Sequence, residues 1–183
     1  PEGQYIISHV SNFRKVKRLG DVVRIFEKIR KKVPAKLILA GDGPERYKVE
    51  QLCSELGVCQ DVEMLGNVQT AAEIYCISDL FLLPSETESF GLAALEALAS
   101  GVPVISSNSG GLPEVNKHGF SGFLSDVGNV DEMAENALKI LKDKETLDRY
   151  KQQAHEHSLN FTIDRILPKY EAIYERLATA RVI

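Results

Sequence analysis

The stretch Leu80-Phe-Leu-Leu-Pro-Ser-Glu-Thr-Glu-Ser-Phe-Gly-Leu-Ala-Ala-Leu-Glu-Ala-Leu-Ala99 joins two apolar runs through a polar loop. The first run is short and uninterrupted, which is typical of a parallel strand covered on both faces. The second favours a helix over Leu92–Ser100, and its apolar character predicts that this helix is buried together with its one charged residue, Glu96. Because Glu88 lies just before the helix, two carboxylates flank its N-terminus.

The same alternation of strand-like and helix-like segments fills the first two thirds of the chain. The expected strands are Tyr5–Val10, Lys36–Ala40, Val62–Leu65, Leu80–Leu83, Val102–Ser106 and Gly122–Leu124. The expected helices between them are about Gly20–Lys32, Glu45–Leu56, Ala71–Ile77, Leu92–Ser100 and a short turn at Pro113. This order predicts an α/β fold with a doubly wound, Rossmann-like parallel sheet.

Beyond Asp126 the pattern predicts helices alone, over Val130–Lys142, Lys144 to about Ser158, and Thr162 to about Ala180. The last helix carries a wide apolar stripe, and Pro168 predicts a kink in it. The stripe consists of Ile163, Ile166, Leu167, Tyr170, Ile173, Tyr174 and Leu177. We expect it to pack on the sheet of this domain; the alternative is docking onto a neighbour that the chain does not contain.

Size and composition fit one globular domain over residues 1–183, of 20.3 kDa with 44% hydrophobic residues. The net charge of −4 argues against nucleic-acid binding, which usually needs a basic surface. No apolar stretch is long enough for membrane insertion, and we interpret the basic face of the first helix as solvated. Since the chain begins at Pro1, we expect a fragment or a processed product of a longer protein.

The cysteines and histidines show no metal-binding pattern. Cys53, Cys59 and Cys76 lack zinc spacing, and we interpret them as reduced packing residues within helical segments of a cytoplasmic protein. The histidines are His9, His118, His155 and His157, and the last two face apart on one helix. We therefore expect no metal site.

Two segments after predicted strands suit an anion. The loop Ser11–Arg18 holds four cations in five residues, which either meet a phosphate or form a solvated charge run. After the fourth strand, Ser89 is a candidate helix cap, and the backbone N–H groups of Phe90, Gly91 and Leu92 lack helical partners. Both segments lie at the carboxyl edge of the predicted sheet, where open α/β sheets bind ligands.

The two carboxylates indicate that the ligand carries more groups than a phosphate. Glu88 faces whatever is attached to the phosphate, and Glu96, with its side chain tilted toward the helix N-terminus, is placed to accept hydrogen bonds from a vicinal diol. Together they suggest a nucleotide sugar. The alternatives are a surface carboxylate for Glu88 and a backbone or water partner for Glu96.

Other ligand classes fit less well. Gly41-Asp-Gly-Pro44 forms a tight turn into a helix, but it follows the second strand, and Arg46 stands where a dinucleotide fingerprint needs glycine. A phosphate-binding GxxxxGK[ST] loop is also absent from the sequence. NAD is therefore disfavoured. The turn Ser107–Glu114 is open to two interpretations, a plain loop or a further contact to hydroxyls or phosphate.

Taken together, these motifs resemble the C-terminal half of retaining GT-B glycosyltransferases of family four. The resemblance covers nearly the whole chain and rests on Gly41–Glu45, Ser85–Leu92, Leu95–Ala97, Gly101–Val104 and Gly110–Val115. Glu88 and Glu96 match the family's Glu-x7-Glu motif. Where the family has Arg-x4-Lys in the first loop, this chain has Asn12 and Lys17, with Arg14 as a candidate replacement for the missing cation.

The resemblance implies a role for each matching residue. Glu88 and Lys17 are expected to be catalytic, and Glu96 to bind the ribose. The phosphate-binding residues are expected to be Asn12, Arg14, Phe90, Gly91 and Leu92. The loops on the side of the base are expected to contribute Gly41, Gly43, Asn67 and Val68.

Within the family, Val10–Arg18 and the helix after it are similar to the enzymes that make N-acetylglucosaminyl L-malate in bacillithiol biosynthesis. This implies transfer of N-acetylglucosamine from UDP-N-acetylglucosamine to L-malate, with retention and without a metal or other cofactor. The acceptor would bind an N-terminal domain absent from this chain, so the isolated domain should be inactive; a homo-oligomer is possible. The alternatives are a non-catalytic nucleotide-sugar-binding or assembly module and a GT-B nucleotide-sugar epimerase.

Overall fold

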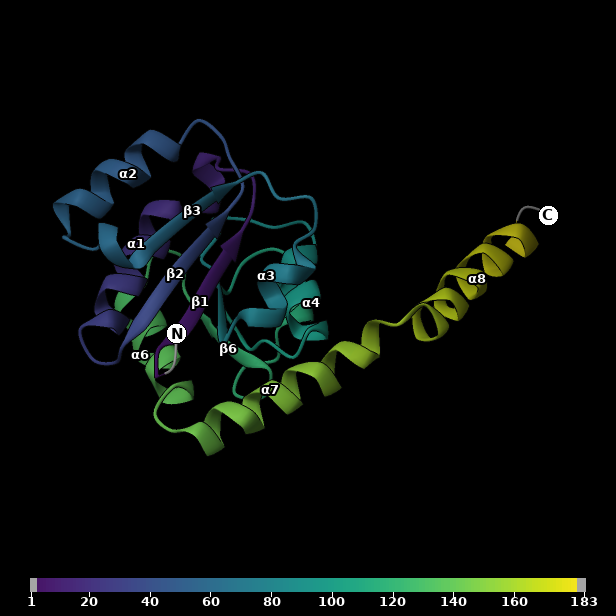
Figure 1. The fold of residues 1–183 in the computed structure, drawn as a ribbon. Coiled ribbons are helices and arrows are strands. Elements are labelled where there is room, and N and C mark those ends of the chain that lie inside the picture. The colour runs from purple at the N-terminus through teal and green to yellow at the C-terminus, as the bar shows by residue number, and fades with distance from the viewer. Residues whose placement is uncertain (1–2, 181–183) are drawn as a thin grey trace.

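Six parallel strands form a single sheet in the order β3-β2-β1-β4-β5-β6 (Figure 1). The computed structural model describes residues 3–180. The strands are β1 Tyr5–Val10, β2 Ala35–Ala40, β3 Val62–Gly66, β4 Leu80–Leu83, β5 Val104–Ser107 and β6 Gly122–Ser125. The predicted doubly wound α/β fold is confirmed, and each strand lies within two residues of its predicted bounds.

Helices cover both faces of this sheet (Figure 1). The α-helices are α1 Leu19–Arg30, α2 Arg46–Glu55, α3 Ala72–Ile77, α4 Leu92–Ala99, α5 Leu112–Val115, α6 Val130–Ile140, α7 Lys144–Ser158 and α8 Ile163–Ala180. Three 3-10 turns, η1 Lys15–Lys17, η2 Cys59–Asp61 and η3 Leu159–Phe161, complete the described elements. Helices α1, α2 and α6 lie on one face, and α3, α4 and α5 on the other.

Alternate residues of the central strand β4 feed two separate cores. Leu80 and Leu82 of β4 pack with α1 and α6, whereas Phe81 and Leu83 pack with α3 and α4. All four side chains are buried. This two-sided burial explains why β4 is an uninterrupted apolar run instead of an alternating one.

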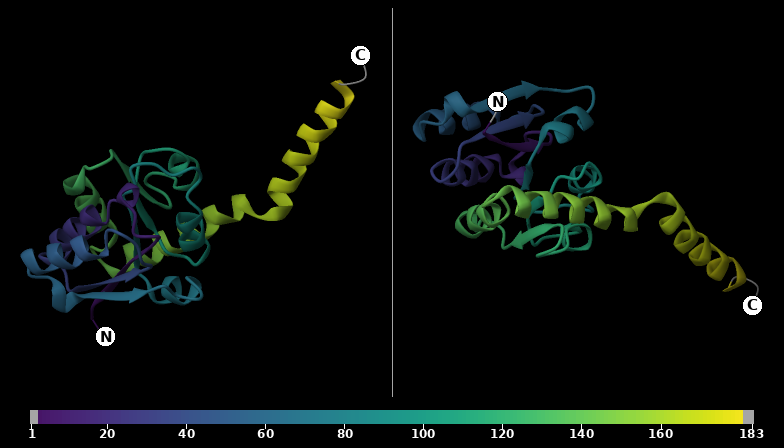
Figure 2. Two further views of the ribbon diagram at one scale, coloured as in Figure 1. Left: turned by 90° about the horizontal axis from the view of Figure 1, so that it is seen from above. Right: turned by 60° about the horizontal axis from the view of Figure 1, so that its bottom comes forward.

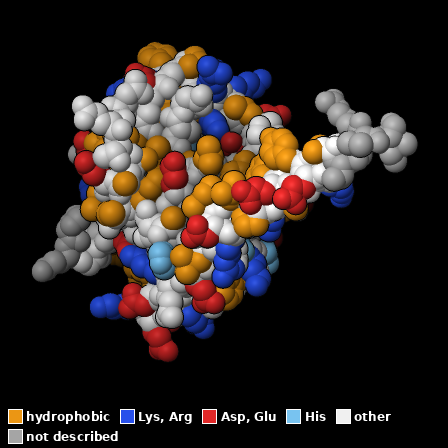
Figure 3. Space-filling model, turned by 90° about the vertical axis from the view of Figure 1, so that its right-hand side faces the viewer, with side chains coloured by type: hydrophobic (Ala, Val, Ile, Leu, Met, Phe, Trp, Pro, Cys, Tyr) orange, Lys and Arg blue, Asp and Glu red, His pale blue; other side chains and the backbone are white. Residues whose placement is uncertain are grey.

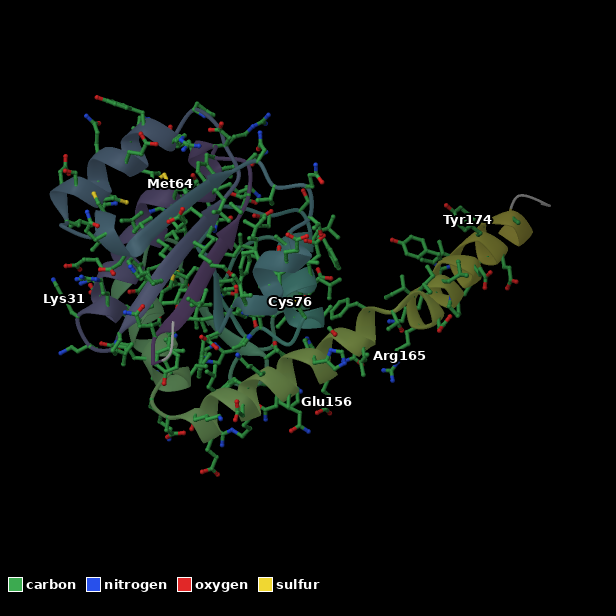
Figure 4. All side chains as sticks on the ribbon, viewed as in Figure 1. Lys31, Met64, Cys76, Glu156, Arg165 and Tyr174 are labelled. Atoms are coloured by element: carbon green, nitrogen blue, oxygen red, sulfur yellow. The ribbon has the colours of Figure 1, made fainter. Side chains whose placement is uncertain are left out.

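Helix α8 projects away from the body of the domain (Figures 1 and 2). Helix α7 packs against α4 and α6, and the chain then leaves the domain through η3 and the extended residue Thr162. Helix α8 continues through Pro168, where the sequence predicted a kink. The figures agree that its far end, with Tyr174, lies well clear of the sheet (Figures 1 and 4).

The predicted packing of this helix on the domain's own sheet is wrong. Six of the seven apolar side chains in its stripe are between 47% and 70% exposed, namely Ile163, Leu167, Tyr170, Ile173, Tyr174 and Leu177. The seventh, Ile166, is half-buried. Hydrophobic side chains accordingly line the projecting helix in the space-filling view (Figure 3). Helical periodicity identifies an apolar face, but it does not tell which surface covers that face.

The cysteines only partly match the expectation that they are packing residues. Cys53 is buried on α2, but Cys59 and Cys76 are exposed. Cys59 lies in the short turn η2 instead of a packed helix, and Cys76 lies on the open side of α3 (Figure 4). All three thiols are free. In the described part of the chain, no helix has the length and apolar character needed to cross a membrane.

Candidate active site

The strand order reverses between β1 and β4, which are hydrogen-bonded neighbours at the middle of the sheet. The loops after these strands therefore diverge at the carboxyl edge, and such a switch point leaves a crevice for a ligand. Here the amide of Glu86 donates to the carbonyl of Val16 over 2.8 Å and joins the two loops. The cation-rich loop and the Glu88 loop are thus brought together, as the sequence predicted.

Lys17 and Glu88 meet at this switch point. The Lys17 ammonium donates to Glu88 Oε1 over 2.6 Å, and the Ser85 hydroxyl donates to the same oxygen over 2.8 Å. Both charged side chains are largely enclosed, at 19% and 14% exposed. Among the described residues, no hydrogen bond is made to Glu88 Oε2. One carboxylate oxygen is therefore fixed, and the other remains able to accept from a ligand hydroxyl.

The turn after β5 supports the backbone of Glu88. The amide of Gly111 donates to the Glu88 carbonyl over 2.8 Å. Gly110 has φ of +58°, and a Cβ atom there would lie 2.0 Å from the same carbonyl oxygen. Ser107 at the end of β5 donates to the carbonyl of Ser85 over 2.5 Å. Only a residue without a side chain fits at position 110, so the Gly110-Gly111 pair fixes the position of Glu88.

The N-terminus of α4 opens beside Glu88. Gly91, with φ of +95°, occupies the cap position, and no side chain caps the helix, so the predicted cap role of Ser89 is wrong. The left-handed conformation of Gly91 turns the chain into the helix directly. The amides of Phe90 and Gly91 donate to no described residue, and the first amides of any helix, here from Leu92 onward, lack intrahelical acceptors. Free N–H groups and the positive end of the helix dipole together favour an anion here.

The remaining phosphate candidates lie on the first loop. Asn12 and Arg14 are both exposed, on either side of the buried ring of Phe13. Arg14 makes no ion pair with a described side chain. Its guanidinium is therefore uncommitted, as a cation that replaces the missing arginine would need to be.

Gly41 and Gly43 hold this first loop in place. A Cβ atom on Gly41 would lie 1.8 Å from the Ser11 carbonyl oxygen, and one on Gly43 would lie 2.7 Å from that of Phe13. The Phe13 amide donates to the Asp42 carbonyl over 2.8 Å. The two glycines therefore allow close packing of the loops after β1 and β2.

Glu96 lies on α4 facing α3, and its carboxylate is exposed. The prediction that it is buried is wrong because α4 buries only the face with Ala94, Ala97 and Leu98, and an apolar sequence does not mean that every face of a helix is covered. Glu96 Oε2 accepts from the Tyr75 hydroxyl at 3.3 Å. A cavity of about 320 Å³ lies beside this pair, between the start of α3 and the end of α4.

The loop after β3 provides the last two predicted positions. Asn67 is exposed and Val68 is half-buried, and both directly follow Gly66 at the end of β3. The Gly66 carbonyl accepts from the Gly41 amide over 2.7 Å. The loops after β2 and β3 are therefore neighbours, as the predicted grouping of Gly41, Asn67 and Val68 requires.

His9 is part of the site, although sequence analysis considered it only as a metal ligand. Its ring is fully buried at the end of β1, with Nδ1 2.8 Å from the Leu82 carbonyl and Nε2 2.7 Å from the Ser11 hydroxyl. Burial lowers the pKa of His9 to about 4, and the nearby positive charge of Lys17 acts in the same direction. The imidazole is therefore neutral near pH 7 and cross-links the strands below Lys17 and Glu88. A histidine within an apolar strand was the available sequence signal.

Within residues 3–180, no three His, Cys, Asp or Glu side chains gather closely enough to hold a metal ion. His155 and His157 do face apart, as expected: His155 contacts the carbonyl of Ala99, whereas the ring of His157 packs against Phe120 and Phe161.

Comparison with known proteins identifies the family. The family model described as glycosyl transferases group 1 matches residues 1–157. The chain belongs to this glycosyltransferase family. Its fold is that of the C-terminal, Rossmann-like domain of GT-B enzymes, family four, with a long helix added at the end.

Two solved structures and one sequence relative illustrate the relationship. Sucrose-phosphate synthase from Thermosynechococcus elongatus superimposes with a TM-score of 0.87 and 26% identity, over 98% of this chain and 47% of that one. The pneumococcal O-GlcNAc transferase GtfA, solved with UDP and GlcNAc, has a TM-score of 0.82 at 21% identity, over 95% of this chain and 36% of that one. At that identity the likeness to GtfA concerns the fold alone.

The sequence relative is N-acetyl-alpha-D-glucosaminyl L-malate synthase of Bacillus anthracis. This glycosyltransferase domain is 46% identical to it over 174 residues, which cover 94% of the chain and 46% of that enzyme. The chain thus spans about half the length of this curated relative.

Proposed function

We propose that this domain binds UDP-N-acetylglucosamine as the donor half of a retaining glycosyltransferase whose acceptor is L-malate. The observation that carries the proposal is the 46% identity to N-acetyl-alpha-D-glucosaminyl L-malate synthase, which extends over 94% of the chain. The proposed protein consists of this domain and an acceptor-binding half outside this chain.

The geometry supports a specific binding position for the donor. The diphosphate lies at the N-terminus of α4, against the amides of Phe90, Gly91 and Leu92, with Lys17, Asn12 and Arg14 on the opposite side. The ribose diol meets Glu96. The base lies toward Gly41, Gly43, Asn67 and Val68, and the sugar lies against Glu88.

The proposed chemistry requires stabilisation of the departing diphosphate. Lys17 donates one of its three N–H groups to Glu88 and keeps two for phosphate oxygens, so both residues remain paired when donor binds. The amides at α4 point at the same developing charge and need no reorganisation. Glu88 Oε2 orients a sugar hydroxyl, and a phosphate oxygen of the leaving group takes the acceptor's proton in a front-face attack.

Calorimetric titration of this chain tests donor binding. UDP and UDP-N-acetylglucosamine should bind, whereas GDP and NAD should bind much more weakly at the same salt concentration. Tighter binding of NAD or GDP would contradict the proposal. Transfer of N-acetylglucosamine to L-malate should appear only with the full-length enzyme; release of free sugar or of an epimerised nucleotide sugar would instead favour a hydrolase or an epimerase.

Two substitutions separate the roles of the carboxylates. Glu96→Ala should weaken UDP binding about 10- to 100-fold, because a charged acceptor of two hydroxyl hydrogen bonds is lost. Glu88→Gln should leave UDP affinity within about twofold but lower transfer by the full-length enzyme about 100-fold, because the sugar is misplaced. Calorimetry and a transfer assay check these results. An unchanged UDP affinity in Glu96→Ala would refute the ribose role.

A further inference from the structure

Tyr75 on α3 reaches the site from the protein interior. Its side chain is only 2% exposed, and its ring packs edge-on against Phe81 of β4, with the ring centroids 5.5 Å apart and an angle of 83° between the planes. A buried aromatic ring held between a helix and a central strand has little rotational freedom. The phenol oxygen is therefore presented at a fixed place on the border between α3 and α4.

The phenol meets the carboxylate of Glu96 at that border. The separation from Glu96 Oε2 is 3.3 Å, and since a carboxylate only accepts, the hydroxyl donates. Burial raises the pKa of Tyr75 and the negative charge of Glu96 raises it further, which keeps this donor protonated. No lysine or arginine among residues 3–180 pairs with Glu96. Tyr75 thus provides the one side-chain contact that the structure records for this exposed carboxylate.

An exposed glutamate otherwise samples several rotamers, and binding a ligand in one of them costs side-chain entropy. The hydrogen bond to Tyr75 holds Oε2 at the wall of the cavity described above, which is also lined by Thr70, Ala72, Ala99 and Ser100. Glu96 Oε1 and the remaining lone pair of Oε2 stay available to two adjacent hydroxyls. The arrangement orients the carboxylate before any ligand arrives.

We infer that Tyr75 is a positioning residue that orients Glu96 for a ribose diol, and so contributes to the choice of ribonucleotides over 2′-deoxyribonucleotides. This inference rests on the proposed ribose role of Glu96. Tyr75 acts on the ligand through this carboxylate. Removal of the Tyr75 hydroxyl should therefore lower nucleotide affinity more when the sugar offers Glu96 two hydroxyls than when it offers one.

The test compares UDP with 2′-deoxy-UDP in calorimetric titrations of wild-type chain and Tyr75→Phe, which keeps the ring. UDP affinity should fall about 3- to 10-fold, the effect of one typical hydrogen bond, and 2′-deoxy-UDP affinity should fall less. Tyr150→Phe is the matched control, because that phenol is also largely buried but donates to Gly119, away from the site. In a chain that already carries Glu96→Ala, adding Tyr75→Phe should cause no further loss.

A ligand-free readout accompanies the titrations. NMR couplings should show one Glu96 side-chain rotamer in the wild type and an average of several in Tyr75→Phe. An unchanged rotamer distribution, equal losses for both nucleotides, or additive losses in the double variant would overturn the role of Tyr75 alone. A wild-type chain that binds UDP no better than 2′-deoxy-UDP would overturn the ribose role of Glu96, and the inference with it.

Discussion

Single residues at the switch point combine burial with a fixed protonation state. His9 is enclosed below Lys17 and Glu88, with a pKa lowered from 6.5 to about 4. The unfolded chain therefore binds this proton before the folded chain does as the pH falls. The stability that neutral His9 contributes is fully present above its unfolded pKa, and it is lost as the pH falls from 6.5 to about 4.

The first prediction concerns this pH dependence. Between about pH 7 and about pH 5, the His9 contribution to the free energy of unfolding should fall by about 2 kcal/mol. His9→Gln should remove that part of the slope, whereas His155→Gln, at an exposed site, should retain it. Urea denaturation at a series of pH values measures both. Parallel stability profiles for wild type and His9→Gln would contradict the assignment.

The second prediction concerns Gly110. Gly110→Ala should cost at least about 3 kcal/mol of stability, because its Cβ would collide with the Glu88 carbonyl. By moving Glu88, which is proposed to contact the sugar, it should also weaken binding of UDP-N-acetylglucosamine. Gly119→Ala is the control, because Gly119 has a similar φ of +74° but open space around it. Only the strain of the left-handed backbone should then lower the stability, by about 1 kcal/mol. Thermal unfolding and calorimetry compare the two. Equal losses would show that the close approach is unimportant.

At the scale of elements, the apolar runs predict most of the strands and helices. The fifth strand begins at Val104 instead of Val102, since Pro103 has no N–H group for a sheet ladder. The sequence also places Lys17 and Glu88 at one edge of the sheet. It does not reveal Tyr75 or His9 as site residues, because their partners are 21 and 73 residues away and neither spacing belongs to a local motif.

Two elements far apart in the chain meet at the start of α4. Phe161 of η3 packs edge-on against Phe90, with centroids 6.1 Å apart, and against His157 of α7, at 5.7 Å. The turn proposed to bind the diphosphate therefore contacts the segment between α7 and α8. Any movement of that segment therefore changes the packing of the Phe90 ring.

The third prediction tests this contact. Phe161→Ala should lower the free energy of unfolding by about 1–2 kcal/mol, as expected for a half-buried aromatic ring. It should also speed hydrogen exchange at the Leu95 amide, which donates to the Gly91 carbonyl over 3.1 Å. Leu159→Ala, on the same turn but with a side chain 44% exposed, should change exchange at Leu95 little. Identical exchange in both variants would argue against coupling between η3 and α4.

At the scale of the whole molecule, the described part of the chain leaves the apolar face of α8 uncovered. The chain covers 46% of the length of N-acetyl-alpha-D-glucosaminyl L-malate synthase, its relative from Bacillus anthracis, which leaves room for a second half of similar size. We expect that half to pack on α8. The face would then be part of an interdomain interface within the full-length protein.

The fourth prediction follows from this arrangement. Ile173→Lys should change the stability of the present chain by no more than about 0.5 kcal/mol, because the Ile173 side chain is 47% exposed on the projecting helix. In the full-length enzyme the same change should lower stability by more than about 1 kcal/mol, through a buried unpaired charge. Glu171→Lys on the same helix serves as the surface control. If Ile173→Lys changed the stability of the full-length enzyme equally little, the other half would not pack on this face of α8.

The 18 residues of α8 also form a rod about 27 Å long, anchored at one end beside the Phe90–Phe161 contact. A rotation of about 10° at that anchor would carry the far tip through about 5 Å, given the helical rise of 1.5 Å per residue. The helix therefore acts as a lever arm. A displacement too small to disturb the sheet becomes, at the tip, a shift of nearly one helical turn.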